Sequence, residues 1–488
     1  MLISLKAFLP ELTLVGFLAA LFLLDGFIPK VRENRFPLIW VMVSCLAAAI
    51  ATGAVKNMSG AFFSGMVAST GLTTFFRYFF LFAGGATAYL TLSSGEIEKR
   101  GRSEFSILLL CMTFGLSLMT LSNHFLMLYI GIETVSIISF VLAGFARESL
   151  RSNEASFKYL VYGGVCSGLM IYGISLIYGY TGSLAYPQIA EALLKNNGTH
   201  PFVFYFALFL VYAGFAYKIS SFPFHFWTPD VYEGSPTPVA TFFSVGPKAA
   251  GIGALLHFLM TALSQKDANG TWTLIQGINI APVLALLSAA TMVVGNLSAV
   301  AQTNVKRILA FSSIAHVGYV LMGFVVMTPA AFVSIIFYLI AYCAMNIGAF
   351  WIVGIVADQK GKEDLAAFKG LGWNMPVVGV CMAIFLFSLT GIPLFSGFIG
   401  KFLLFGALIQ MPGYLWLALL GVLNSVISLY YYAKILRAIW LEKPEGTTGS
   451  VKLPMTQLVG LVGLAVPTIV LGLFFSPVLE MAQKWIAQ

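Results

Sequence analysis

The stretch Tyr217-Lys218-Ile-Ser-Ser-Phe-Pro223-Phe-His225-Phe-Trp227-Thr-Pro229-Asp230 decides the fold, because it places a charged lysine beside a helix-breaking proline in an apolar run. Pro223 has no N–H and its ring clashes with the preceding turn, so a helix is expected to open there. The backbone carbonyls that this frees near Lys218 can then hold water. Further prolines follow at short spacing, so we expect a short half-helix and a turn after the break rather than a continuous helix over 223–240.

Four lysines lie in runs that are otherwise apolar enough to cross a membrane: Lys158, Lys218, Lys248 and Lys401. Lys401 follows Pro393, so it too is expected beside a broken helix. A charge at the centre of a spanning helix costs roughly 2.5–3.5 kcal/mol, so four cost about 10 kcal/mol, which is comparable with the stability of a whole domain. We therefore expect these lysines to face a wet interior, to have partners, and to hold or move ions.

The composition indicates a polytopic helical membrane protein. The 488 residues are 59% hydrophobic and 9% charged, whereas soluble domains carry about 25% charged residues. Apolar runs longer than about 18 residues recur along the whole chain. The formal charge of +8 does not indicate nucleic-acid binding, because the cations do not cluster on one soluble face. The five cysteines lie in apolar runs without CxxC spacing, which favours small buried hydrophobes over metal or redox roles.

We predict an all-α polytopic fold with about fourteen transmembrane helices in a single membrane domain, 1–488. The first apolar stretch continues through Asp25 without a clean cleavage site, so we interpret it as a span and not as a removed signal peptide. The seventh and twelfth spans are expected to be broken, at Pro223 and at Gly391-Ile-Pro393. The predicted spans are 9–29, 36–54, 68–93, 104–121, 123–145, 154–180, 201–221, 236–263, 277–300, 308–327, 331–357, 374–410, 414–436 and 454–475.

The lysines and arginines of the connections predict the orientation. Sixteen lie in alternate connections beginning with 30–35, and five lie in the other connections and the termini. The positive-inside rule then places both termini outside the cytoplasm, in the periplasm of a bacterial inner membrane. The sixteen are Lys30, Arg32, Arg35, Lys99, Arg100, Arg102, Arg147, Arg151, Lys306, Arg307, Lys360, Lys362, Lys369, Arg437, Lys443 and Lys452, and the five are Lys6, Lys56, Lys195, Lys266 and Lys484.

A weak internal repeat relates two parts of the chain. Phe140-Val-Leu-Ala-Gly-Phe145 is similar to Tyr319-Val-Leu-Met-Gly-Phe324, and Tyr159-Leu160 is similar to Tyr338-Leu339, both at an offset of 179 residues. Spans 4–8 and 9–13 are therefore predicted to be two five-helix copies, and a five-span unit followed directly by its copy must insert upside down. The expected organisation is an N-terminal three-helix segment (1–103), a first repeat (104–263), a second, inverted repeat (275–440), and a last helix with a tail (454–488).

The stretch Phe224-His225-Phe226-Trp227-Thr228-Pro229-Asp230-Val231-Tyr232-Glu233-Gly234 resembles the signature of the antiporter-like subunits of proton-pumping NADH–quinone oxidoreductase, respiratory complex I. The likeness covers nearly the whole chain and is closest to the subunit N, or mitochondrial subunit 2, type. It implies a proton-translocating subunit of the membrane arm that is not itself a redox enzyme. Its partners would be neighbouring antiporter-like and small membrane subunits and the lipid bilayer, without nucleic acid.

Six residues are candidates for proton translocation. Glu133, in the middle of the fifth span, is either a helix-packing acid bonded to a nearby serine or a partner for Lys218, and the resemblance implies the second reading. Lys248 and Lys401 lie too deep to snorkel to the interface. Lys158 lies near a span end and is either such a snorkelling lysine or part of the proton path. His316 is either a relay, because its ordinary pKa is near 6.5, or a structural histidine. The candidates are Glu133, Lys218, Lys248, Lys401, Lys158 and His316.

Outside this set, Glu11, Asp25 and Arg77 are expected to form interior pairs or to contact a neighbouring subunit. His225, Asp230 and Glu233 resemble a metal set only by composition, because the prolines spoil a helical spacing, so no metal is expected. We find no dinucleotide fingerprint, P-loop or cysteine cluster, so NADH, flavin, iron–sulfur clusters and quinone are expected on partner subunits. Two alternatives stay open: a subunit of a related multisubunit cation/proton antiporter, and a purely structural membrane subunit.

Overall fold

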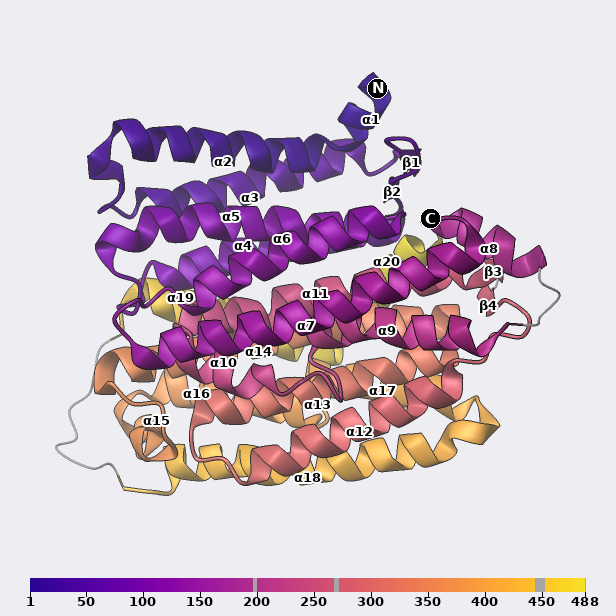
Figure 1. Ribbon diagram of the computed structural model, residues 1–488. Helices are drawn as coiled ribbons and strands as arrows, with labels where there is room; N and C mark the ends of the chain where they lie inside the picture. Colours follow the sequence, from indigo (N-terminus) through magenta and orange to yellow (C-terminus); the bar gives the residue numbers. More distant parts are fainter. Residues whose placement is uncertain (196–199, 267–271, 444–452, 488) are drawn as a thin grey trace.

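Long helices lie side by side in a single bundle, which confirms the all-α polytopic class (Figure 1). The computed structural model describes residues 1–195, 200–266, 272–443 and 453–487. Within these ranges, twelve helices are long and apolar enough to cross a membrane, or thirteen if a bent pair at 365–390 is counted as one span. The two described sheets are short antiparallel hairpins, with Ala61 paired to Ala68 in one and Gln265 paired to Thr273 in the other.

Each of the fourteen predicted spans contains a helix, although two of them are not among the twelve. The third predicted span contains α4 (Gly71–Thr91), which is long enough but is made less apolar by Arg77 and several threonines and glycines. The twelfth contains two short helices, α16 (Pro376–Thr390) and α17 (Ser396–Ile409), of 15 and 14 residues. The break predicted at Gly391-Ile-Pro393 is therefore present, and each half is shorter than a full span.

The remaining elements follow in chain order. The N-terminal part contains α1 (Leu2–Ala7), α2 (Leu9–Phe27), α3 (Phe36–Val55), β1 (Gly60–Phe62) and β2 (Val67–Ser69). The middle part contains α5 (Arg102–Leu121), α6 (Phe125–Ala143), α7 (Leu150–Thr181), α8 (Tyr186–Lys195), α9 (Phe202–Ile219), α10 (Trp227–Gly234), α11 (Thr237–Ala262), β3 (Ser264–Lys266) and β4 (Trp272–Leu274). The last part contains α12 (Ala281–Val300), α13 (Val305–Val326), α14 (Pro329–Lys360), α15 (Leu371–Asn374), α18 (Leu415–Trp440), α19 (Met455–Leu473) and α20 (Ser476–Ala487). Short 3-10 segments cover Pro29–Val31, Lys99–Gly101, Leu365–Phe368 and Pro412–Tyr414.

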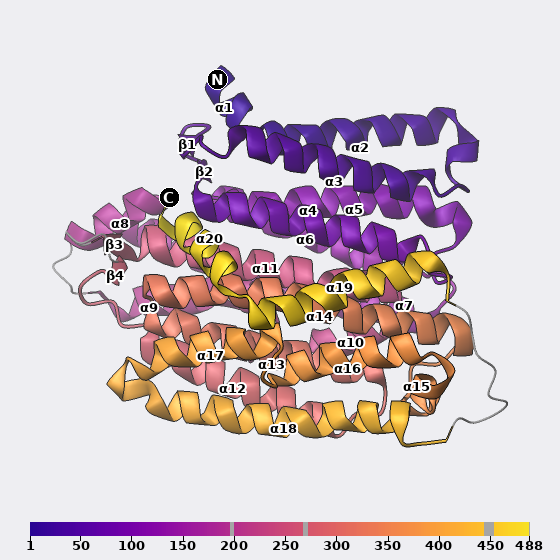
Figure 2. The same cartoon turned by 180° about the vertical axis from the view of Figure 1, so that it is seen from behind.

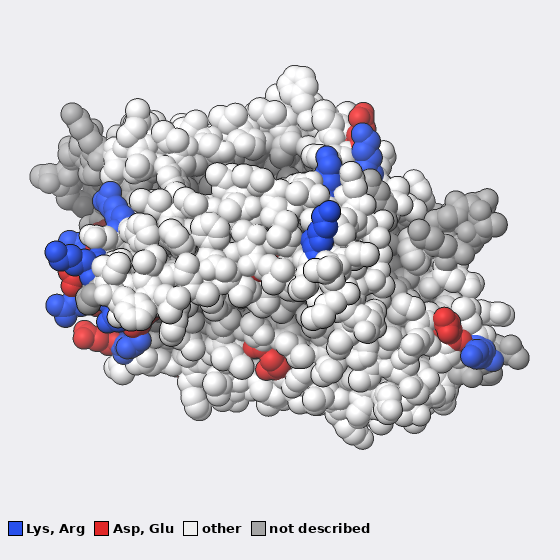
Figure 3. Space-filling model, turned by 90° about the horizontal axis from the view of Figure 1, so that it is seen from above, with Lys and Arg blue, Asp and Glu red and all other residues white. Residues whose placement is uncertain are grey.

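Both termini lie at the same end of the bundle, as an even number of crossings requires (Figures 1 and 2). The described connections with most of the basic residues, such as those between α2 and α3 and between α14 and α15, lie at the opposite end, which we call the basic end. Lys452 of the predicted basic set lies outside the described residues. Viewed over the N-terminal helices, charged side chains gather towards the two ends and leave a broad band with few charges between them (Figure 3).

Helices of equal length recur at the offset seen in the sequence. α5 and α12 both have 20 residues, and α7 and α14 both have 32, with starts 179 residues apart in each case. α11 and α18 both have 26 residues. α5 begins at the basic end, whereas α12 follows the β3–β4 hairpin at the other end and so begins there (Figure 1).

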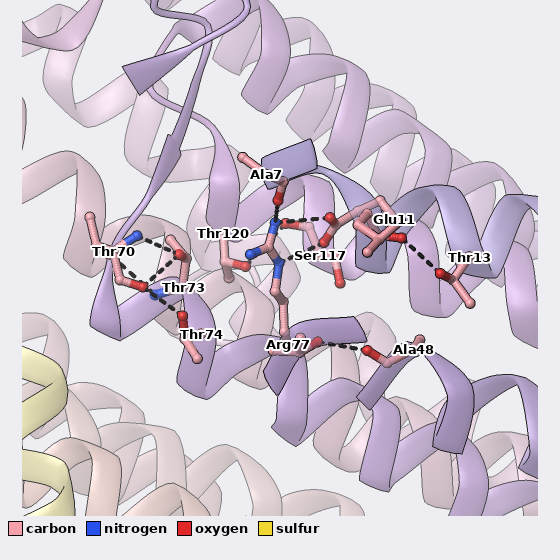
Figure 4. Close-up of polar contacts among 12 residues, drawn as sticks. Ala7, Glu11, Thr13, Ala48, Thr70, Thr73, Thr74, Arg77, Ser117 and Thr120 are labelled. Carbon is pink, nitrogen blue, oxygen red and sulfur yellow. Dashed lines mark hydrogen bonds and ion pairs between the residues drawn. The ribbon is translucent and has the colours of Figure 1, made fainter. Parts of the chain in front are cut away.

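A buried ion pair fastens the N-terminal helices to one another (Figure 4). Arg77 of α4 donates from Nε and Nη2 to the two carboxylate oxygens of Glu11 on α2, at 2.8 and 2.9 Å, and Nη2 also donates to the Ala7 carbonyl at 3.1 Å. Both side chains are almost fully buried. Asp25 instead pairs with the more exposed Arg32 near the basic end. The three residues therefore form pairs inside the chain, one buried and one near the surface.

The last two helices return across the bundle towards its N-terminal part. α19 packs on α14, α16 and α17, and α20 then crosses to contact both α14 and α4 (Figure 2). The Trp485 ring lies against the Phe75 ring of α4, with a centroid distance of 5.0 Å. Helix α20 therefore connects the end of the chain to its N-terminal segment.

Candidate functional site: a row of buried lysines

The first break in the bundle lies between α9 and α10, where Pro223 predicted it. Ser220 adopts the left-handed conformation, with φ at 64°, directly after the last turn of α9. The Tyr217 carbonyl in the last turn of α9 accepts hydrogen bonds from the Ser220 N–H at 3.2 Å and from the Trp227 indole at 3.1 Å. The Phe222 N–H donates to Thr291 on α12 at 3.0 Å. The segment between α9 and α10 is thus held by hydrogen bonds to both α9 and α12.

Lys218 lies in the last turn of α9 and is 1% exposed. Its Nζ is buried and has no hydrogen-bond partner in the protein. Glu133, in the middle of α6, is close enough to interact with it electrostatically, but Oε1 of Glu133 is also buried without a partner. The predicted pair is therefore not a direct salt bridge in this structure. Buried polar groups without partners in the protein generally bind ordered water, so a water bridge fits this space.

Lys248 lies in the middle of α11, directly after Pro247, which the helix includes. It is 2% exposed, and its Nζ donates a hydrogen bond to Ser313 Oγ on α13 at 2.6 Å. Lys218 packs closely against the same helix, because a Cβ added at Gly251 would lie 3.3 Å from the Lys218 Cβ. Gly251 is less than one turn beyond Lys248, so the glycine lets α9 bring its lysine next to the lysine of α11.

His316 lies on α13, three residues after Ser313 and therefore on the same helix face. The two ring nitrogens of His316 contact different tyrosine hydroxyls. Nδ1 is hydrogen-bonded to Tyr338 on α14, and Nε2 lies 3.2 Å from the Tyr432 hydroxyl on α18. His316 thus joins three helices through groups that can both donate and accept a proton.

Lys401 lies at the second break, on α17. Gly391 ends α16 with φ at 90°, a conformation that glycine adopts readily, and the last carbonyls of α16 are left free. The Lys401 Nζ donates to two of those carbonyls, Leu389 at 3.1 Å and Thr390 at 2.9 Å. It also lies 3.3 Å from Ser425 Oγ and 4.4 Å from the centre of the Tyr319 ring.

Five of the six candidate residues follow one another through the bundle, and we call them the lysine row: Glu133, Lys218, Lys248, His316 and Lys401. Lys248, His316 and Lys401 are hydrogen-bonded to serine or tyrosine hydroxyls, whereas Lys218 and Glu133 lie beside them without a direct hydrogen bond. Helix α13 forms its centre, because Ser313, His316 and Tyr319 follow at three-residue spacing and meet Lys248, two tyrosines and Lys401 in turn. The row crosses from the first predicted repeat to the second. Apart from Lys401, which lies on the shorter helix α17, its residues lie in helices that are long enough to span a membrane.

Lys158 lies outside the lysine row. Its side chain is 38% exposed, and Nζ forms ion pairs of 2.7 Å with both Glu154 and Asp230. Asp230 also binds Arg307, which in turn binds Glu233 at 2.8 Å. Burial raises the pKa of Asp230, but the hydrogen bonds from Lys158 and Arg307 outweigh burial and hold that pKa below its ordinary value. Lys158 thus belongs to a charged cluster that joins α7, α10 and α13.

Sequence reasoning missed the polar groups that connect the charged residues. Ser313, Tyr338, Ser425 and Tyr432 each contact a residue of the row. Serine and tyrosine are common in apolar helices, so their positions alone carried no signal, although Tyr338 is part of the repeat match. In the described ranges, no group of three or more His, Cys, Asp or Glu residues could hold a metal ion.

Comparison with known proteins defines the class of the fold. Residues 122–428 match the family described as NADH:quinone oxidoreductase/Mrp antiporter, transmembrane. A chain of respiratory complex I from Thermus thermophilus superimposes with a TM-score of 0.79 at 29% identity, covering 96% of this chain and 98% of that one. A chain of the Mrp complex from Dietzia sp. superimposes with a TM-score of 0.84 at 22% identity, covering 99% and 97%, which shows a shared fold.

A relative with a specific name narrows this class. NADH-quinone oxidoreductase subunit N 2 of Sorangium cellulosum is 43% identical over 503 residues, covering 99% of this chain and 97% of its own length. The chain therefore belongs to the subunit N family of NADH-quinone oxidoreductase, respiratory complex I. It is an antiporter-like, multi-pass membrane subunit of that enzyme.

Proposed function

We propose that this chain translocates protons through the lysine row and that quinone reduction elsewhere in complex I drives the transfer. The observation that carries the proposal is the set of three almost fully buried lysines and one histidine, of which Lys248, His316 and Lys401 each contact a serine or tyrosine hydroxyl. A protein that used these helices only as a scaffold would be more stable with apolar residues there, because buried charges are costly. The arrangement suits repeated gain and loss of protons.

Proton transfer along the row needs carriers and bridges. Lysine amines and the His316 imidazole can carry a proton, whereas serine and tyrosine hydroxyls can pass one on, because they donate and accept at once. A nearby carboxylate favours a charged lysine, and burial without one favours the neutral amine. A movement of Glu133 relative to Lys218 would therefore switch Lys218 between holding and releasing a proton. The absence of a direct contact between them in the structure leaves room for such a movement.

The lengths of the paired helices support the inverted-repeat interpretation. The matches of α5 with α12, α7 with α14 and α11 with α18 fall within the proposed units 104–263 and 275–440. Each unit then contributes one broken helix, and the two breaks carry Lys218 and Lys401. Residues 1–103 and 454–488 flank the two repeats in this interpretation.

The proposed surroundings follow from the relatives. The partners would be the other membrane-arm subunits of complex I and the lipid bilayer, and the flavin, iron–sulfur and quinone chemistry would belong to other subunits. We infer that the basic end faces the cytoplasm of a bacterial cell, with both termini periplasmic. A C-terminal reporter that is active only in the cytoplasm should stay silent, and a bright signal would reverse the orientation.

The central test is Lys248→Ala in the assembled complex, in membrane vesicles. Proton pumping per quinone reduced should fall, while NADH oxidation by detergent-solubilised complex persists. Lys434→Ala is the matched control, because Lys434 also lies in a long helix but donates to the Val300 and Gln302 carbonyls outside the row. Full pumping by an assembled Lys248→Ala complex would favour a structural subunit.

The related cation/proton antiporter remains the second candidate function, supported by the fold shared with the Mrp complex. Mass spectrometry of the intact native assembly separates the two. Redox subunits in the same particle support the complex I function, and an assembly of membrane antiporter subunits alone would favour the antiporter.

A further inference from the structure

A line of buried polar side chains runs along α11 from its first residue to Lys248. Thr237, Thr241, Ser244 and Lys248 are spaced by four, three and four residues, so they share one face of the helix. The first three are completely buried, and Lys248 is 2% exposed. Since α11 rises about 1.5 Å per residue, the line is about 16 Å long.

The helix α14 covers this line and adds a polar group to it. Asn346, which is also fully buried, donates from Nδ2 to Ser244 Oγ at 2.6 Å. Gly354 of the same helix faces Thr237, since an added Cβ there would lie 3.2 Å from the threonine methyl group. The two helices are therefore antiparallel and closely packed. We call Thr237, Thr241, Ser244 and Asn346 the α11 seam.

The outer end of the seam meets an acid at the molecular surface. The Thr237 N–H donates to Glu96 Oε2 at 2.6 Å. Glu96 also lines an open cavity of about 410 Å³ at the basic end, together with charged residues such as Glu98 and Arg147. One carboxylate thus connects an open, polar cavity to the first turn of α11.

The inner end of the seam meets the lysine row. Lys248, His316, Tyr338 and Tyr342 line part of a small space of about 10 Å³, whose other lining residues are apolar. A space of that size holds about one water molecule when polar groups surround it. Water there would connect Lys248 to His316 directly, in addition to the bond through Ser313.

Four buried polar atoms along this course have no hydrogen-bond partner in the protein: Glu96 Oε1, Thr237 Oγ1, Asn346 Oδ1 and the Tyr342 hydroxyl. Leaving such a group unsatisfied is costly, and native proteins generally satisfy it with ordered water. Thr241 and Ser244 do donate to helix carbonyls, at 2.7 and 2.6 Å, as hydroxyls in helices often do. That explanation does not cover the four atoms, which follow the seam from the cavity to Lys248.

We propose that the α11 seam is a hydrated proton-access route between Glu96 and Lys248. Protonated Glu96 gives its proton to water in the seam, the proton moves along the hydroxyl-lined water chain, and the neutral Lys248 amine takes it up as an ammonium. The Glu96 carboxylate then regains a proton from water in the open cavity. This inference rests on the proposed function, because the route supplies protons to the lysine row. The protons enter the route at the basic end.

The first experiment removes the hydroxyls without changing the shape of the helix. In vesicles that carry the assembled complex, Thr241→Val combined with Ser244→Ala should slow proton pumping through this chain by about tenfold, which corresponds to ~1.4 kcal/mol at the barrier. Thr241→Ser should keep pumping close to the wild-type value. Thr52→Val is the matched control, because Thr52 is also a buried hydroxyl bonded to a helix carbonyl but lies on α3.

The second experiment tests the entry acid. Glu96→Gln keeps an oxygen that can accept the Thr237 N–H but cannot release a proton, so pumping should fall while assembly is unchanged. Glu98→Gln, at the same cavity, should pump normally. If the seam variants and Glu96→Gln all pump at the wild-type ratio while Lys248→Ala does not, the entry lies elsewhere and the seam is structural. If Lys248→Ala also pumps normally, the proposed function itself is wrong.

Discussion

The two broken helices hold their lysines in different ways. At the second break, Lys401 Nζ meets two free carbonyls and a serine hydroxyl, so the opened backbone itself binds the side chain. At the first break, the comparable carbonyl of Tyr217 binds the Trp227 indole, and Lys218 Nζ has no partner in the protein. The difference teaches that the backbone at a break can bind a charged lysine directly, as at Lys401, or leave the lysine to the electrostatic interaction with a nearby acid, as for Lys218 and Glu133.

This contrast assigns the two lysines different tasks in the proposed mechanism. Carbonyl oxygens carry partial negative charge and bind an ammonium group directly, so the Lys401 side chain is held in place at the break. Lys218 depends on an electrostatic interaction with Glu133 that spans a gap, so a small displacement changes its preference for a proton. In this mechanism, the proton affinity of Lys218 therefore responds more strongly to a small displacement, whereas Lys401 is the more firmly bound lysine.

The largest effect is expected from replacing Lys401. Lys401→Ala removes a proton carrier and leaves the Leu389 and Thr390 carbonyls without their donor, and proton transfer through this chain should fall by about a hundredfold. Lys401→Arg should be nearly as harmful, because guanidinium keeps its charge but does not release a proton at working pH. Pumping per quinone reduced in vesicles measures both. A wild-type ratio for the arginine variant would reduce Lys401 to a fixed charge.

The next test concerns the coupling of Lys218 to Glu133. Lys218→Ala and Glu133→Gln should each impair coupled turnover, and the double variant should lose less than the sum, with a coupling energy of about 0.5–3 kcal/mol. The same double-variant cycle on Lys401 and Glu133 should show no coupling. Strictly additive losses for Lys218 and Glu133 in assembled complexes would mean that the two residues act independently.

A smaller effect on pumping is expected from removing a serine hydroxyl, and it should differ between the two breaks. Ser425→Ala removes one contact of Lys401 and should lower the pumping rate by about fivefold, as expected for ~1 kcal/mol. Ser221→Ala removes a contact to Tyr212 but none to Lys218. It should therefore leave pumping nearly unchanged, and an equal loss in both variants would remove the contrast between the breaks.

The smallest effect is expected at Lys158, outside the row. Its side chain is more than a third exposed, and surface ion pairs contribute only about 0–1 kcal/mol. Lys158→Gln should lower the melting temperature of the complex slightly, with a difference that shrinks as salt increases. Pumping should remain near wild type. A pumping loss as large as that of Lys218→Ala would place Lys158 on the proton path.

The sequence predicted the broken helices well because proline and glycine act locally. Pro223 and Gly391 each interrupt a helix within a few residues of the positions where they stand. Hydropathy located the spans for the same local reason, including α4, where Arg77 lies within a helix and pairs with Glu11, a partner 66 residues away. The buried lysines were also identified from the sequence, because a charged residue is rare within a long apolar run.

The bridging groups could not be predicted because they depend on which helix faces meet. Ser313 contacts Lys248 across 65 residues of sequence, and Tyr432 meets His316 across 116. Neither type of side chain is unusual in an apolar helix. Lys158 is the opposite case, a residue that the sequence grouped with the buried lysines. In the structure, its side chain instead belongs to a charged cluster at the surface.

The contact between α20 and α4 has a consequence for how the chain is made. The ribosome completes α4 long before it makes α20. The Phe75 face of α4 therefore stays uncovered by Trp485 until α20 has been synthesised. Chains generally begin to fold from the N-terminus during synthesis. Here an early part of the nascent protein acquires part of its packing late, after α20 has been made.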